Sequence, residues 1–203
     1  MDVIELKKYH RPGGLVDQQT TRPKGVLNKI KTAFCNTSQT KDGLIKRPTE
    51  FYEFFINDKP LSEILTEFCS LDNSLLNNWV GVLGSFSNRQ CELNTIKRIL
   101  LKEITEQEIM AVFPKDLEKY YLDNAIESYY EELADEEINI YACAECGDYG
   151  CGGFKIKVDK VNDTIIWTYN DEGNILQFHF DKHQYFDTFE TYSKTVENKN
   201  NNR

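Results

Sequence analysis

A regular pattern of strands and turns in the last third of the chain is the feature that most limits its fold. Four short segments rich in β-branched and aromatic residues follow one another there, over residues 138–141, 154–158, 164–169 and 175–180. Turn-forming residues connect neighbours at Val161-Asn162-Asp163 and at Asp171-Glu172-Gly173-Asn174. Turns this short join adjacent antiparallel strands. The sequence therefore predicts a four-stranded antiparallel β-meander.

Helical patterns occur on both sides of these strands, so we predict an α+β fold. Thr105 and Glu108 have the spacing of a capping box, in which each side chain satisfies a free main-chain N–H of the other. From Leu117, apolar residues recur every four positions, which indicates a helix of about five turns. Asp181 and Gln184 repeat the capping pattern, and apolar spacing after them predicts a C-terminal helix packed on the sheet.

Composition divides the chain into three parts. Residues 1–50 are rich in Pro and Gly and contain 10 Lys and Arg residues against 5 Asp and Glu residues, which predicts a basic arm or a set of loops. Residues 51–196 are predicted to form a single α+β domain, in which residues 104–137 are a helical, acidic insertion. The polar residues 197–203 are expected to be a disordered tail.

The charge of the chain restricts its partners. Residues 51–203 contain 14 basic and 28 acidic residues, a net charge of −14, whereas the whole chain carries −9. A body of this charge repels phosphates, so we expect it to bind no nucleic acid and expect a basic protein partner instead. The sequence contains no run of about 18 apolar residues and no signal-peptide pattern. We therefore expect no membrane association and a cytoplasmic location.

A cysteine-rich segment is the most distinctive chemical feature. Two cysteines separated by two residues are followed by Gly147 and by a third cysteine, which is half of a typical zinc site. One interpretation is therefore a zinc site formed by Cys143, Cys146, Cys151 and His179, with Asp148 or His183 as the alternative fourth ligand.

Two other interpretations of this segment stay open. Cysteines in a glycine-rich hairpin commonly pack as small hydrophobic side chains and bind nothing. A thiolate of Cys143 or Cys146 would instead attack a disulfide in a redox enzyme, but such motifs normally lead from a strand into a helix. Here another strand is predicted to follow. Zinc or thiol chemistry would make this segment the centre of an enzyme.

The predicted helix after Leu117 offers a site of a different class, because it is strongly acidic and carries tyrosines. Tyr is common at interfaces, and acidic clusters speed association with basic partners. The expected partner-binding residues are Tyr120, Asp123, Glu127, Tyr130, Glu131 and Glu132. The alternative is a helix whose charges are only solvated.

Enzyme motifs of several common classes are missing from the sequence. It contains no G-x-S-x-G, no G-x-x-x-x-G-K-[ST] and no H-E-x-x-H. The first functional hypothesis is therefore a non-enzymatic binding protein, for example of the immunity or antidote type that neutralises a basic toxin. A zinc-binding or thiol-dependent enzyme is the alternative.

Several segments occur in an order that resembles an uncharacterised family of small bacterial proteins. They are Asn57-Asp58-Lys59-Pro60-Leu61, the W-V-G-V-L-G run at residues 79–84, the C-x-x-C-G-D-x-G-C-G segment at residues 143–152, Ile165-Ile166-Trp167, and Phe180-Asp181 with Tyr185. The resemblance covers about residues 51–192, and residues 104–137 look like an insertion relative to the family. No activity is established for that family, so the resemblance implies no chemistry.

Overall fold

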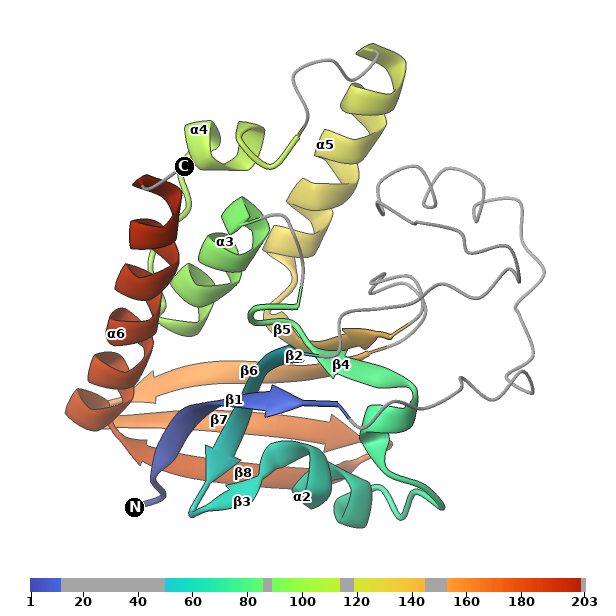
Figure 1. Cartoon of the computed structure of the whole chain (residues 1–203), viewed down its shortest axis with the longest axis vertical. Coiled ribbons are helices and arrows are strands. Elements are labelled where there is room, and N and C mark those ends of the chain that lie inside the picture. Colours follow the sequence, from blue (N-terminus) through green and yellow to red (C-terminus); the bar gives the residue numbers. More distant parts are fainter. Residues whose placement is uncertain (12–49, 86–88, 114–118, 145–152, 202–203) are drawn as a thin grey trace.

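The computed structural model describes residues 1–11, 50–85, 89–113, 119–144 and 153–201. Within these residues the chain forms two antiparallel β-sheets and several helices (Figure 1). The smaller sheet lies across the larger one, and a long C-terminal helix runs along one side of both (Figure 1). The predicted α+β class and C-terminal helix are confirmed.

The larger sheet has the strand order β4-β5-β6-β7-β8. Its strands are β4 (Trp79–Gly81), β5 (Glu137–Cys143), β6 (Phe154–Val161), β7 (Thr164–Asp171) and β8 (Asn174–Asp181). Strands β5 to β8 are the four predicted strands, each antiparallel to the next. The prediction of a sheet with four strands is wrong, because β4 pairs with β5 and adds a fifth. With three residues, β4 is too short to show an alternating pattern.

The smaller sheet has the order β1-β2-β3 and contains a strand that the sequence did not predict. Strand β1 (Ile4–His10) pairs along its whole length with β2 (Glu50–Ile56), and β3 (Lys59–Pro60) pairs with the end of β2. Residues 4–10 therefore belong to the folded body and not to the predicted arm. The rest of the arm, residues 12–49, lies outside the described residues.

The helices are α2 (Leu61–Phe68), the short 3-10 helix η1 (Leu75–Asn77), α3 (Arg89–Ile99), α4 (Glu106–Met110), α5 (Lys119–Ala134) and α6 (Lys182–Asn201). Three of the helices, α4, α5 and α6, follow the sequence patterns, whereas α3 was not predicted. The capping box of Thr105 and Glu108 is present at the start of α4. Asp181 accepts hydrogen bonds from the first N–H groups of α6. Because α6 continues to Asn201, most of the tail predicted to be disordered is helical.

The core lies between the two sheets and α6, and aromatic rings dominate it. Trp167 of β7 is completely buried, with its ring against Phe54 of β2 and Phe189 of α6. Its Nε1 donates to the Tyr185 hydroxyl of α6 at 2.8 Å, and that hydroxyl donates to the carbonyl oxygen of Ile99 at 2.9 Å. These two hydrogen bonds link β7, α6 and the end of α3 through the interior.

Candidate functional site

Helix α5 rises away from the two sheets, with only its C-terminal part beside the other helices (Figure 1). None of its side chains from Leu122 to Ala134 is buried. Its apolar stripe is only partly covered, at Leu122, Ala125, Ile126, Tyr129 and Leu133. Amphipathic helices normally bury such a stripe against a core, so α5 retains apolar surface available to a partner.

A line of carboxylates runs along the exposed side of α5. Asp123, Glu127 and Glu131 are spaced four residues apart, which places them one above the other on the helix surface. All three are exposed, and they make no ion pair within the part of the chain that the structure describes. Tyr130 is 43% exposed, and helical geometry places it between this line and the apolar stripe. Like charges at this spacing repel one another, so a cationic partner would relieve the repulsion.

The acidic run continues beyond α5, but lysines of β6 neutralise it there. Asp135 accepts a hydrogen bond from Lys155 at 2.6 Å, and Glu136 accepts one from Lys157 at 2.7 Å. These bonds are the main reason why the pKa values of both carboxyl groups are lowered. The negative charge without a counterion therefore lies on the helix itself.

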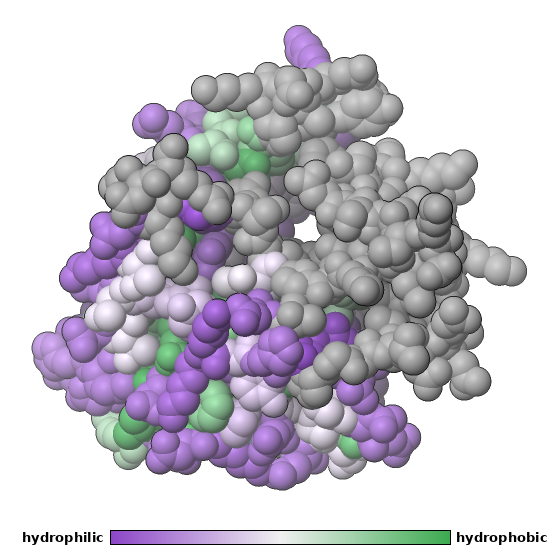
Figure 2. Space-filling model, viewed as in Figure 1, coloured by the Kyte–Doolittle hydropathy of each residue, from purple (hydrophilic) through white to green (hydrophobic). Residues whose placement is uncertain are grey.

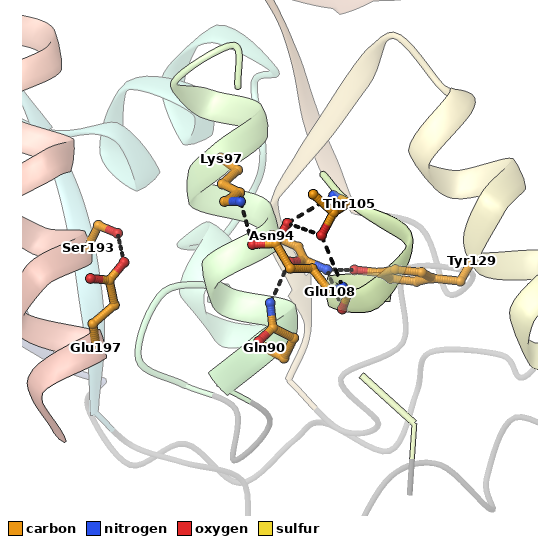
Figure 3. A network of polar contacts seen from close by, with 8 residues as sticks. All are labelled: Gln90, Asn94, Lys97, Thr105, Glu108, Tyr129, Ser193 and Glu197. Carbon is orange, nitrogen blue, oxygen red and sulfur yellow. Dashed lines mark hydrogen bonds and ion pairs between the residues drawn. The ribbon is translucent and has the colours of Figure 1, made fainter. Parts of the chain in front are cut away.

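Contacts with α3 and α4 hold the C-terminal half of α5 in place (Figure 3). The buried Asn94 of α3 donates its side-chain N–H to the Tyr129 hydroxyl at 2.9 Å, and Phe113 packs edge-on against the Tyr129 ring. Arg98 donates to the carbonyl oxygen of Asp135 at 2.7 Å, where a cation interacts favourably with the end of a helix. The carboxylate line is therefore presented on a helix fixed at one end.

The predicted partner-binding residues differ in how far their side chains are exposed. Four of them are exposed on α5: Asp123, Glu127, Tyr130 and Glu131. Glu132 is half-buried and lies near Cys91 and Tyr129, so it faces the body. Tyr120 belongs to α5, and its side chain lies outside the described part. No sequence pattern points to Asn94, because its contact with Tyr129 joins residues 35 positions apart.

The first of the three clustered cysteines lies at the end of β5. Cys143 is half-buried, and it pairs with Trp79 of β4. Cys146, Cys151 and the candidate ligand Asp148 lie outside the described residues. The convergence of three thiolates on one zinc ion therefore stays a prediction.

His179 does not lie near Cys143. It is in β8, and strands β6 and β7 separate it from β5. Neighbouring strands are about 4.8 Å apart, so three spacings put about 14 Å between these residues. Zinc binds its ligands at about 2.0–2.3 Å, so the two side chains do not share an ion in this arrangement. Among the residues that the structure describes, no three His, Cys, Asp or Glu side chains are placed to hold a metal ion.

Arg11, directly after β1, lies near the Cys143 thiol. Its buried guanidinium donates to the carbonyl oxygens of Leu76, at 2.6 Å, and of Asn77. Burial lowers the pKa of this guanidinium, and the nearby Cys143 thiol raises it. A cation beside a thiol favours the thiolate, which is the form that binds metal or attacks a disulfide.

A buried carboxyl group lies between β2, α2 and β5. Glu53 is 0% exposed; Tyr141 donates its hydroxyl to Oε1, while Oε2 has no partner among the described residues. Burial raises the pKa of Glu53 to about 7, although the hydrogen bond from Tyr141 acts in the opposite direction. Because Glu53 is closed off from solvent, its ionisation affects the stability of the fold.

Comparisons of the chain with models of protein families, with curated proteins and with solved structures find no match. The resemblance to a family of small bacterial proteins therefore stays a prediction. Within the described residues, no helix has the length and apolar character needed to cross a lipid bilayer.

Proposed function

We propose that this protein is a non-enzymatic binding protein that docks a basic protein partner on helix α5. The observation that supports the proposal is the exposed line of Asp123, Glu127 and Glu131, which lacks counterions among the described residues. The matching surface would present Lys or Arg side chains at similar spacing. An immunity or antidote protein that covers a basic surface of a toxin is the specific form of this function.

Two kinds of surface on and near α5 would contribute differently to binding. The carboxylates would steer a basic partner during encounter, while Tyr130 and the partly covered Ile126 would supply apolar contact. The visible face of the molecule is mostly hydrophilic, and one of several hydrophobic areas on it lies at the level of α4 (Figure 2). Exposed Met110 of α4 adds to the apolar surface of this region.

Replacing Asp123, Glu127 and Glu131 together by Lys is expected to slow association with the partner at least about tenfold, because steering by opposite charge is reversed. The free energy of unfolding should change by less than about 0.5 kcal/mol per substitution, since exposed charges contribute little to stability. Association rates at two salt concentrations and thermal melting would measure the two effects separately.

A matched control changes the net charge equally at exposed sites elsewhere, by replacing Glu63, Glu103 and Glu172 with Lys. A partner first captured from the host by the wild-type protein should bind this control at nearly the wild-type rate. Equal losses in the two variants would mean that net charge alone determines binding. Full binding by the α5 variant would contradict the proposed site.

The cysteine segment supports a second candidate function, a zinc-binding or thiol-dependent enzyme centred on Cys143, Cys146 and Cys151. The position of Arg11 near Cys143 favours it, since a cation there would favour the thiolate form at the start of the segment. The fourth zinc ligand would be Asp148 or water, because His179 is too far away and His183 lies farther still, in α6 beyond the end of β8.

If the thiols hold zinc, native mass spectrometry should find one ion per chain, and Cys146→Ala should lose it. Such a site forms together with the local fold, so removal of the ion should also lower the melting temperature. Cys91→Ala, at a cysteine in α3, is the control that should keep the ion. A wild-type protein without metal, and a Cys146→Ala variant that melts almost like it, would end the zinc interpretation in favour of thiols that only pack.

A further inference from the structure

We propose that the free edge of strand β8 is a self-association surface, on which β8 pairs antiparallel with β8 of a second copy of this chain. Strand β8 is the last strand of the five-stranded sheet, and β7 covers one of its two edges. This inference is independent of the function proposed for α5, which lies outside this sheet.

The hairpin register shows which main-chain groups of β8 are free. A two-residue turn at Glu172 and Gly173, both with positive φ, makes Asp171 and Asn174 the first hydrogen-bonded pair. Every second residue from Asn174 onward therefore bonds to β7. The main-chain N–H and C=O groups at the odd-numbered positions 175, 177 and 179 point away from β7.

A contact with the N-terminal segment confirms this alternation and occupies one end of the edge. Asp2 donates its N–H to the carbonyl oxygen of His179 at 2.7 Å, and its carboxylate accepts the N–H of His179 at 2.8 Å. The outward groups of Ile175 and Gln177 form no hydrogen bond with any residue that the structure describes. Two donors and two acceptors are thus available side by side.

The free part of this edge lacks the devices that usually prevent strand pairing. Proteins protect an edge with charged residues, Pro, bulges or a very short strand. Residues 174–180 contain no charged residue, Pro or Gly, and Ile175 is 62% exposed. By contrast, β1 at the edge of the smaller sheet carries Glu5, Lys7 and Lys8, and the opposite edge strand of the larger sheet, β4, has only three residues.

A second copy can pair with all the outward main-chain groups of Ile175 and Gln177 if a two-fold axis passes through Leu176. Ile175 of each chain would face Gln177 of the other, and each such pair would exchange two N–H···O bonds. The half-buried Leu176 would contact its counterpart on the axis. The absence of charge on this stretch allows two chains of net charge −9 to approach there. Because the opposite edge strand is so short, β8 pairs with β8 and the assembly closes as a dimer.

Sedimentation of the full chain over a range of concentrations tests this inference. The wild-type protein should shift from monomer towards dimer as concentration rises, with weak affinity because a short edge buries less than the roughly 1,200 Å² of stable interfaces.

Gln177→Pro removes an outward N–H that β7 does not use, so the fold should tolerate it. Two of the four bonds are lost, and the dimer Kd should rise at least about tenfold. Gln177→Thr keeps the N–H and should associate like the wild type.

A second variant is needed if Gln177→Pro melts well below the wild type, because loss of the dimer could then result from unfolding. Replacing both Ile175 and Gln177 by Lys places like charges opposite each other across the axis, which destabilises a strand pair. This variant should stay monomeric. A wild-type protein that is monomeric at all concentrations would overturn the inference. Dimers formed by both edge variants, each correctly folded, would overturn it as well.

Discussion

Relative to the variant Glu53→Gln, the wild-type protein is expected to lose about 3 kcal/mol of free energy of unfolding as the pH rises from about 4.5 to about 7. Burial raises the pKa of Glu53 from 4.5 to about 7, so the folded state holds a proton that the unfolded state has released. The contribution of Glu53 to stability is therefore fully present below pH 4.5 and is lost as the pH rises towards 7, at about 1.4 kcal/mol per pH unit. Gln cannot ionise and removes this dependence.

Denaturant titrations of both proteins at several pH values measure the difference directly. Other carboxyl groups act in the opposite direction at lower pH; the pKa of Glu108 is lowered to about 2, mainly by its hydrogen bond with Lys97. Their effect is common to both proteins and cancels. Glu63→Gln, an exposed position in α2, is the control that should keep the wild-type dependence. Parallel stability curves for wild type and Glu53→Gln would show that Glu53 ionises normally.

Replacing Trp167 by Ala is expected to lower the free energy of unfolding by about 3–5 kcal/mol, as large cavities in protein cores do. The substitution removes ring contacts with Phe54 and Phe189 at the junction of both sheets with α6. It also leaves the Tyr185 hydroxyl without the donor at Trp167 Nε1. Equilibrium unfolding followed by circular dichroism would measure the loss.

Two further variants separate the causes of this loss. Trp167→Phe keeps an aromatic ring but removes the N–H, so it should cost less than Trp167→Ala. Trp79, the other tryptophan of the chain, lies half-buried in the edge strand β4. Trp79→Ala should therefore destabilise the protein less than Trp167→Ala. An equal or larger effect would contradict the central position of Trp167 in the core.

Local patterns were sufficient to predict the strands of the meander. In β6, buried Phe154, Ile156 and Val158 alternate with partly exposed residues, and short turns fix the order of the neighbouring strands. The same reasoning missed β1, because the consecutive Lys7 and Lys8 break the alternation. Only pairing with β2, about forty residues later, makes this segment a strand. Such pairing leaves no local signal.

The candidate site was predictable to a similar degree. Four-residue spacing of acidic and apolar positions was enough to predict a helix with the exposed line of Asp123, Glu127 and Glu131. The attachment of that helix through Asn94 and Tyr129 depends on tertiary packing, and the sequence gives no hint of it. The proximity of Arg11 to Cys143 has the same origin, since it joins the residue directly after β1 to the last residue of β5.

The dependence of the smaller sheet on distant residues has a consequence for synthesis on the ribosome. Phe54 of β2 packs against Trp167 and Phe189, which are added to the chain more than a hundred residues later. At roughly 5–20 residues per second, the apolar side chain of Phe54 is made about 6 to 27 seconds before these partners. During that time the nascent chain presents an unsatisfied hydrophobic surface, which is the kind of segment that chaperones bind.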